Sequence, residues 1–197
     1  MEGTENSPAR ERVLTVAERL FSERGYATVT LQDIAGQLGM RKASLYNHAP
    51  GGKEQLYVEV MERNLARHQH GIEAALTGAE PRTLRAQLRA VSRWLLSQPA
   101  INVARMQRID MPEITPEHAT RLMGAAYQAL MVPIERAVEA AYRRGDIRFV
   151  NGALVAGIFL TNIEAIRDLY QYDAPEIPLE VVVDDAIDIL LDGLHRR

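Results

Sequence analysis

The stretch GMRKASLYNHAPGGK, residues 39–53, concentrates side chains that donate hydrogen bonds to anions. It contains both lysines of the chain, together with Arg41 and His48, and it contains no acidic residue. The whole chain has 26 acidic residues against 23 lysines and arginines, with a formal net charge of −3. A basic segment without acids is therefore unusual here. Cationic, hydroxyl and amide side chains of this kind bind DNA phosphates and base edges, so the segment predicts an anionic partner.

The charge of the chain differs between its front and its remainder. Residues 1–53 hold seven basic and six acidic side chains, whereas acids are in excess in the rest of the chain. Such a division indicates that the two parts have different partners. We expect residues 1–53 to bind an anionic partner and the acidic remainder of the chain to have a different role.

The elements that position the basic segment have the spacing of a helix-turn-helix over residues 31–50. Ala35 is small where the two helices would cross, Gly39 permits the turn, and Leu45 faces the shared core. The second helix is short enough to lie in a major groove. This geometry leaves one set of polar residues on its outer face: Arg41, Lys42, Ser44, Asn47 and His48.

The stretch TVTLQDIAGQLGMRKASLYNHAPGGKEQL resembles the DNA-binding signature of the TetR (tetracycline repressor-like) family of transcriptional regulators. In that family a threonine precedes the first helix of the motif, and a Pro-x-Lys-x-x-Leu pattern opens the next helix. The resemblance covers residues 8 to about 60. The matching positions, in order, are Thr30, Ile34, Ala35, Gly39, Leu45, Tyr46, Pro50, Lys53 and Leu56.

The resemblance implies that Thr30, Tyr46 and Lys53 lie at phosphate-contacting positions. The chain departs from the family pattern at Ala49, where an aromatic residue usually precedes the proline, and by one additional glycine before Lys53. Arg41 also stands where the family usually has a serine or threonine cap. The full set of expected DNA-binding residues is Thr30, Arg41, Lys42, Ser44, Tyr46, Asn47, His48 and Lys53.

Helical periodicity runs through almost the whole sequence, and no alternating pattern typical of strands is present. We predict an all-α chain of about nine helices, in which Pro133 kinks or divides the helix expected at 116–144. The expected domains are a helix-turn-helix domain at 1–52 and a larger helical domain at 53–197, with a helix at 53–76 connecting them. The longest uncharged apolar run, 149–163, is too short for a membrane span and indicates a buried helix.

The larger domain is expected to bind a small molecule and to form the dimer. In the TetR family this domain binds an effector, and its last two helices, here 149–172 and 178–195, form a two-fold interface. Polar or amphipathic residues on otherwise apolar stripes are either satisfied inside the core or across a dimer interface, or they are the few polar anchors of a mostly apolar pocket. The candidate pocket residues are Trp94, Arg105, Met123, Tyr127 and Asn162.

Enzymatic chemistry is not indicated. The chain has no cysteine, and neither HExxH nor GxSxG occurs. His68 and His70 are two apart on a helix and point in different directions, so they form a poor metal pair. The three acids Asp184, Asp188 and Asp192 are expected on a solvated face, and no metal or cofactor is expected.

The sequence is therefore interpreted as a dimeric, cytoplasmic transcription regulator, most simply a repressor. It is expected to bind a palindromic double-stranded operator and to be released by a small, mostly apolar effector, with no membrane partner. Two alternatives remain: a helical ligand-binding protein whose front has lost operator recognition, and a non-specific architectural DNA binder.

Overall fold

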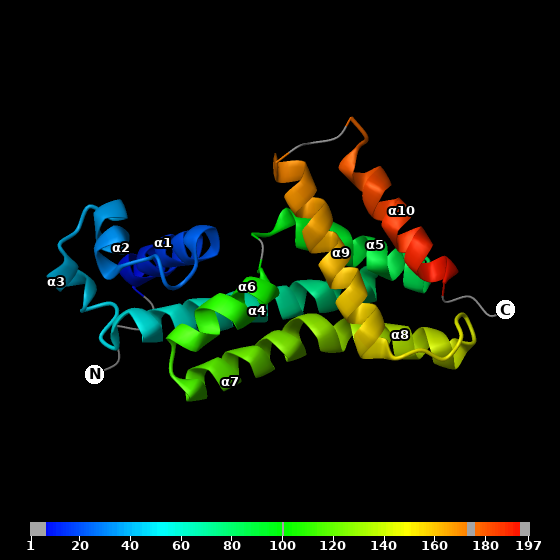
Figure 1. The fold of residues 1–197 in the computed structure, drawn as a ribbon, viewed down its shortest axis with the longest axis horizontal. Helices are drawn as coiled ribbons and strands as arrows, with labels where there is room; N and C mark the ends of the chain where they lie inside the picture. The colour runs from blue at the N-terminus through cyan, green and yellow to red at the C-terminus, as the bar shows by residue number, and fades with distance from the viewer. Residues whose placement is uncertain (1–6, 100, 173–175, 194–197) are drawn as a thin grey trace. The chain divides into compact units, whose positions relative to one another are not determined.

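The computed structural model describes residues 7–99, 101–172 and 176–193, and these residues form helices joined by turns, without strands (Figure 1). The α-helical fold predicted from the sequence is confirmed. The α-helices are α1 (Pro8–Arg24), α2 (Leu31–Gln37), α3 (Lys42–Leu45), α4 (Gly52–Gly78), α5 (Leu84–Ser97), α6 (Val103–Arg105), α7 (Pro116–Ala126), α8 (Val132–Arg144), α9 (Gly152–Tyr172) and α10 (Leu179–Asp192).

The chain divides into two compact units that do not follow the sequence order. The first unit comprises the residues up to Ala66 together with Ile101–Ala125, and the second comprises Arg67–Ala100 and the residues from Ala126 onward. The segment 101–125 thus belongs with the N-terminal helices, although the sequence pattern gave no reason to separate it from the rest of the C-terminal part.

Local capping explains where the first helices begin and end. The Ser7 side chain accepts from the Arg10 backbone N–H, Pro8 follows at the first helical position, and Gly25 ends α1 with a positive φ of 81°. Helix α2 begins with a capping box, in which Thr30 and Asp33 each accept a hydrogen bond from the other's backbone N–H. Such caps satisfy the free N–H groups of the first helical turn.

The core of the first unit is formed by α1, α2 and α3, which pack in sequence order, and by the first half of α4. Leu45 is the buried residue of α3, and it anchors this short helix to the core. The other fully or almost fully buried side chains of this core are Val13, Ala17, Leu20, Phe21, Ile34, Leu56 and Tyr57.

In the second unit α9 packs against α5, α8 and α10 (Figure 1). The buried face of α9 carries Val155, Phe159, Ile163 and Ile166. The Arg167 guanidinium donates to the Gln98 carbonyl oxygen at 2.7 Å and also to that of Leu95. It thereby adds side-chain hydrogen bonds to carbonyl groups at the C-terminal end of α5, where the helical hydrogen-bond pattern ends.

The long helix expected at 116–144 is divided, as predicted. Residues Tyr127–Met131 form a π-helical turn (η3), in which the Val132 N–H donates to the Tyr127 carbonyl, and α8 starts immediately before Pro133. Proline has no N–H and its ring clashes with the preceding turn, so a wider turn before it relieves the conflict. The described residues include no helix with both the length and the hydropathy of a membrane span.

Candidate nucleic-acid interface

The recognition segment, defined here as residues 41–48, is a short helix with a regular continuation. Helix α3 is only four residues long, but His48 N donates to the Leu45 carbonyl and Asn47 N to the Ser44 carbonyl. Buried Leu45 holds this segment against the first unit. The segment therefore presents about two helical turns with a fixed orientation.

The outer face of this segment is polar and exposed, as the sequence predicted. Arg41, Lys42, Ser44 and Asn47 are exposed, Tyr46 is 45% exposed, and His48 is half-buried. Within the described parts of the chain, Arg41 and Lys42 form no ion pair. Because they carry no internal counter-charge, their donors are free for an external anion.

Thr30 lies at the N-terminus of α2, and its hydroxyl is already used locally. It donates to Asp33 Oδ2 at 2.7 Å and accepts from the Asp33 N–H at 3.1 Å. The Asp33 carboxylate accepts from the Thr30 hydroxyl and also from the Thr30 backbone N–H, and these two hydrogen bonds, the first above all, lower the pKa of Asp33. Thr30 is exposed, so it is placed to meet a phosphate while it caps the helix.

Lys53 is turned onto the loop between α1 and α2. Its Nζ donates to the Tyr26 carbonyl oxygen at 2.9 Å and lies 4.0 Å from the centre of the Tyr26 ring. Burial lowers the pKa of Lys53. An ammonium group has three N–H donors, so two remain for a phosphate contact of the kind predicted from the sequence.

Sequence reasoning missed Asp110, a buried carboxylate that organises this unit. Asp110 is 2% exposed, and it accepts from the Tyr26 backbone N–H at 2.9 Å and from the Tyr57 hydroxyl at 3.2 Å. Burial, and then the Asp110 charge, raise the pKa of Tyr57 above its usual range, so Tyr57 remains a donor. A side chain at position 25 would begin 3.2 Å from Asp110 Oδ1, so Gly25 allows this close approach.

Glu54 was also missed, and it connects the first turn of α4 to the start of α7. Its Oε1 accepts from the Thr115 N–H at 2.9 Å and the Thr115 hydroxyl at 2.8 Å, and lies 2.6 Å from His118 Nδ1. These contacts, that of His118 first, lower the pKa of Glu54. No local signal marked Asp110 or Glu54, because their partners are at least 53 residues away in the sequence.

The five candidate pocket residues are divided between the two units. Arg105 and Met123 lie in the first unit, and Trp94, Tyr127 and Asn162 lie in the second. The Arg105 guanidinium donates to the carbonyl oxygens of Ser22 and Phe21, at 3.0 and 3.1 Å. It therefore caps the C-terminal end of α1 in this structure.

In the second unit the candidate residues have different environments. Trp94 packs so tightly on α4 that a side chain at Gly71 would overlap its ring, whereas Tyr127 is exposed and donates to Glu135 Oε1 at 2.7 Å. Asn162 is also exposed. The expected inward positions of Tyr127 and Asn162 were wrong. Asn162 lies one residue, about 100°, from buried Ile163, and Tyr127 begins the π-helical turn.

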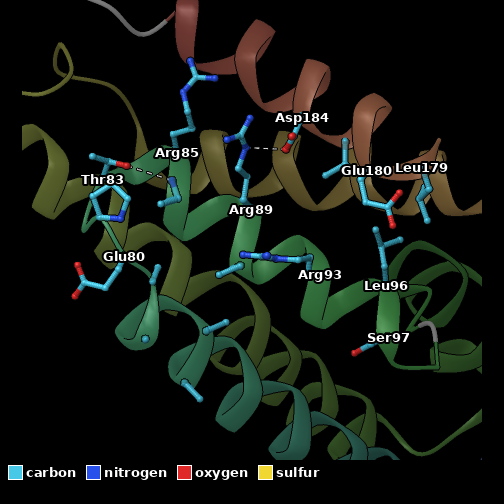
Figure 2. A pocket seen from close by; sticks show the side chains of 18 residues that line it. Glu80, Thr83, Arg85, Arg89, Arg93, Leu96, Ser97, Leu179, Glu180 and Asp184 are labelled. Carbon is cyan, nitrogen blue, oxygen red and sulfur yellow. Dashed lines mark hydrogen bonds and ion pairs between the residues drawn. The ribbon is translucent and has the colours of Figure 1, made fainter. Parts of the chain in front are cut away.

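A groove of about 1090 Å³ opens in the second unit between the end of α4, the face of α5 and the start of α10 (Figure 2). Three arginines of α5 line it at one-turn spacing: Arg85, Arg89 and Arg93. Arg89 Nε lies 2.7 Å from Asp184 Oδ1, and Arg85 pairs with Asp188. The expectation that these two aspartates are merely solvated was wrong, because α10 packs with them facing α5.

Comparison with known proteins identifies the front of the chain. Residues 13–60 match the family model described as bacterial regulatory proteins, tetR family. The matched residues contain α1 from Val13 onward, α2, α3 and the first turns of α4, and these elements include and support the recognition segment.

Two characterised relatives match over this same part of the chain. The HTH-type transcriptional regulator LmrA of Bacillus subtilis is 47% identical over 53 residues, which are 27% of this chain and 28% of LmrA. The negative transcriptional regulator IcaR of the Staphylococcus epidermidis biofilm operon icaADBC is 40% identical over 53 residues, again 27% and 28% of the two chains. The matches thus span less than a third of these relatives.

Solved structures extend the likeness to the whole fold. The regulator AibR, solved in complex with isovaleryl coenzyme A and operator DNA, superposes with a TM-score of 0.71 at 22% identity. The superposition covers 91% of this chain and 96% of AibR. The chain has the fold of AibR over almost its whole length, and its residues 13–60 are similar to the tetR family of bacterial regulatory proteins.

Proposed function

We propose that this protein is a homodimeric transcription regulator that binds a palindromic double-stranded operator and is released from it by a small-molecule effector. The observation that carries the proposal is the exposed recognition segment, which has cationic and amide donors and no acid. We further propose that it represses transcription in the cytoplasm, in line with the negative regulator among its relatives, and that it has no enzymatic activity.

Each protomer inserts the recognition segment into one major groove. Asn47, in the last turn of the segment, has the paired donor and acceptor that read adenine, and Lys42 lies at its start, where it meets the phosphate backbone. Thr30, Tyr46 and Lys53 supply further backbone contacts. Arg41, Ser44 and His48 complete the DNA-binding set.

The dimer forms through α9 and α10. One side of α9 leaves apolar residues exposed at helical spacing, with Leu154 at 62% and Ile158 at 42% exposure, followed by Leu169. On α10 Val181 and Ile189 are likewise exposed. An apolar stripe of this kind is typical of a protein interface. A palindrome requires a two-fold dimer that presents two recognition segments about 34–36 Å apart, or a multiple of that.

The effector binds in the C-terminal part of the chain, and we keep the division into a DNA-binding domain at 1–52 and a ligand-binding domain at 53–197. AibR binds isovaleryl coenzyme A, and by analogy the effector here has an apolar part with polar ends. Of the candidate pocket residues, Trp94 is retained as a place to test within the second unit, and the groove beside Arg93 offers another.

The proposal is tested by selecting duplexes from a random library with the purified protein. A regulator enriches a two-fold symmetric sequence and binds it at two protomers per site, as measured by light scattering on the complex. Enrichment without symmetry, or equal affinity for all duplexes, would instead indicate an architectural DNA binder. Failure to bind any duplex would favour a ligand-binding protein without operator recognition.

The effector is then sought by thermal shift across compound classes, with acyl coenzyme A thioesters tested first. A true effector both raises the melting temperature and releases the selected operator. It can release DNA only to the extent that it binds the released conformation more tightly than the DNA-bound one.

A further inference from the structure

We propose that Arg10, at the start of α1, is a positioning residue that fixes the C-terminal end of the recognition segment without itself reading DNA. This inference rests on the proposed function, because it concerns how the operator is read. It goes beyond the expected DNA contacts, since Arg10 is in the first turn of another helix.

The contacts of Arg10 connect three elements of the first unit. Its Nη1 donates to the His48 carbonyl oxygen, and its Nη2 lies 2.7 and 2.6 Å from the two carboxylate oxygens of Glu59 on α4. The Arg10 side chain is only 16% exposed. A guanidinium that donates to a carboxylate and a carbonyl together has a fixed orientation, because its donors form a rigid planar fork.

The His48 carbonyl accepts from Arg10, whereas carbonyls on either side of it in the chain accept from backbone N–H groups. The neighbouring Leu45 carbonyl accepts from the backbone of His48 and Ala49, and the Ala49 carbonyl accepts from Gly52. A cation near the end of a helical turn also interacts favourably with its free carbonyl groups. Arg10, which lies on another helix, therefore caps the C-terminal end of the recognition segment with a hydrogen bond.

The surroundings of this contact are loosely packed. Ala49 is buried but small, and a cavity of about 290 Å³ lies between it, Asn47, His48, Leu56 and the Arg10–Glu59 pair. A larger apolar side chain at position 49 would hold this end of the segment by packing. With alanine there, the hydrogen-bonded pair of Arg10 and Glu59 supplies the restraint, and Asn47 lies at the edge of the same cavity.

The test compares four variants on the operator selected by the wild-type protein and on a random duplex of the same length. Arg10→Met removes all three contacts, and Arg10→Lys keeps the charge without the fork. Glu59→Gln keeps the shape but removes the charge that orients Arg10. Arg19→Met is the matched control, because Arg19 is an exposed arginine of the same helix that contacts Glu23 and Gln37 and lies outside the Arg10 network.

The positioning role predicts that Arg10→Met and Arg10→Lys both lower operator affinity by roughly tenfold or more, the scale of a lost base contact. Affinity for the random duplex and its salt dependence should stay close to wild type, and Glu59→Gln should also weaken operator binding. Arg19→Met should leave the affinity for both duplexes close to that of the wild type. In the Arg10→Met background, Ala49→Phe should recover part of the operator affinity by filling the cavity.

Two other outcomes would overturn the inference. If Arg10→Lys binds as the wild type does and Glu59→Gln binds DNA more tightly, Arg10 is a direct phosphate contact. If binding to the operator and binding to the random duplex are both lost, and the melting temperature falls strongly, Arg10 only stabilises the domain. A wild-type protein that selects no operator would refute the proposed function, which is a separate result.

Discussion

The recognition segment and the outer face of α9 are both exposed in the single chain, but their chemistry is opposite. The recognition segment exposes Arg41, Lys42 and Asn47, whereas α9 exposes Leu154, Ile158 and Leu169. Exposed cations without an ion pair can bind an external anion. An exposed apolar stripe is stabilised when another apolar surface covers it. The chemistry of the recognition segment therefore suits nucleic acid, and that of the outer face of α9 suits another apolar surface.

The two regions also differ in how they are held. The recognition segment is short, and its C-terminal end accepts a hydrogen bond from Arg10 of α1 at the His48 carbonyl. Helix α9 is a 21-residue helix held by an apolar face against α5, α8 and α10. We therefore expect substitutions in the recognition segment to change its DNA contacts directly. Substitutions on the outer face of α9 should instead weaken DNA binding through loss of the dimer.

The largest effect is expected from a charge on the outer face of α9. Ile158→Asp should abolish the dimer and weaken operator binding by about 100-fold or more, because one recognition segment alone cannot read both half-sites. Sedimentation velocity and operator titration measure the two effects. Tyr142→Asp, which places the same charge on an exposed residue of α8, is the control and should remain dimeric. A dimeric Ile158→Asp protein would contradict the assigned interface.

A second large effect is expected at the carboxylate that supports the recognition domain. Asp110→Ala leaves the Tyr26 N–H and the Tyr57 hydroxyl without their acceptor and should lower the free energy of unfolding by roughly 2–4 kcal/mol. Urea denaturation measures the change. Asp146→Ala is the control, because Asp146 is exposed and pairs with Arg144 on the surface. Equal losses in the two variants would mean that Asp110 has no special role.

Within the recognition segment, base reading and backbone binding should separate. Asn47→Ala should relax base choice at one position of each half-site by about 1–3 kcal/mol. Lys42→Ala should weaken binding to every duplex and reduce the salt slope by about one per subunit. Base reading and backbone binding are distinguished by measuring affinity over a salt series, both for the operator and for its single-base variants. If both variants lose the two kinds of binding equally, the assigned roles are wrong.

The smallest effect is expected at the contact between α4 and α7. The pKa of Glu54 is lowered in the folded protein, mainly by His118. Its contribution to stability is therefore present above the unfolded-state pKa of Glu and is lost as the pH falls through the lowered value. His118→Gln should be less stable than the wild type near pH 6, and the difference should disappear near pH 3. A difference that persists at low pH would exclude the ionised Glu54 contact.

Most of the secondary structure and the recognition segment were determined by the sequence, because their signals are local. The Thr30–Asp33 capping box joins residues three apart, Gly25 and Gly39 end helical turns with positive φ, and Pro133 forces the division of its helix. The acid-free composition of the basic stretch needs no structure to be recognised. These features depend on the nearest turns of the chain alone.

Only the tertiary structure decided which polar groups meet. Asp110 reaches Tyr26 across 84 positions of the sequence, and Arg10 reaches Glu59 across 49, so no periodicity relates the partners. The positions of Asn162, Tyr127, Asp184 and Asp188 were misjudged for the same reason. A helical pattern gives the angle between residues on one helix, but the direction that faces the core depends on which helices pack around it.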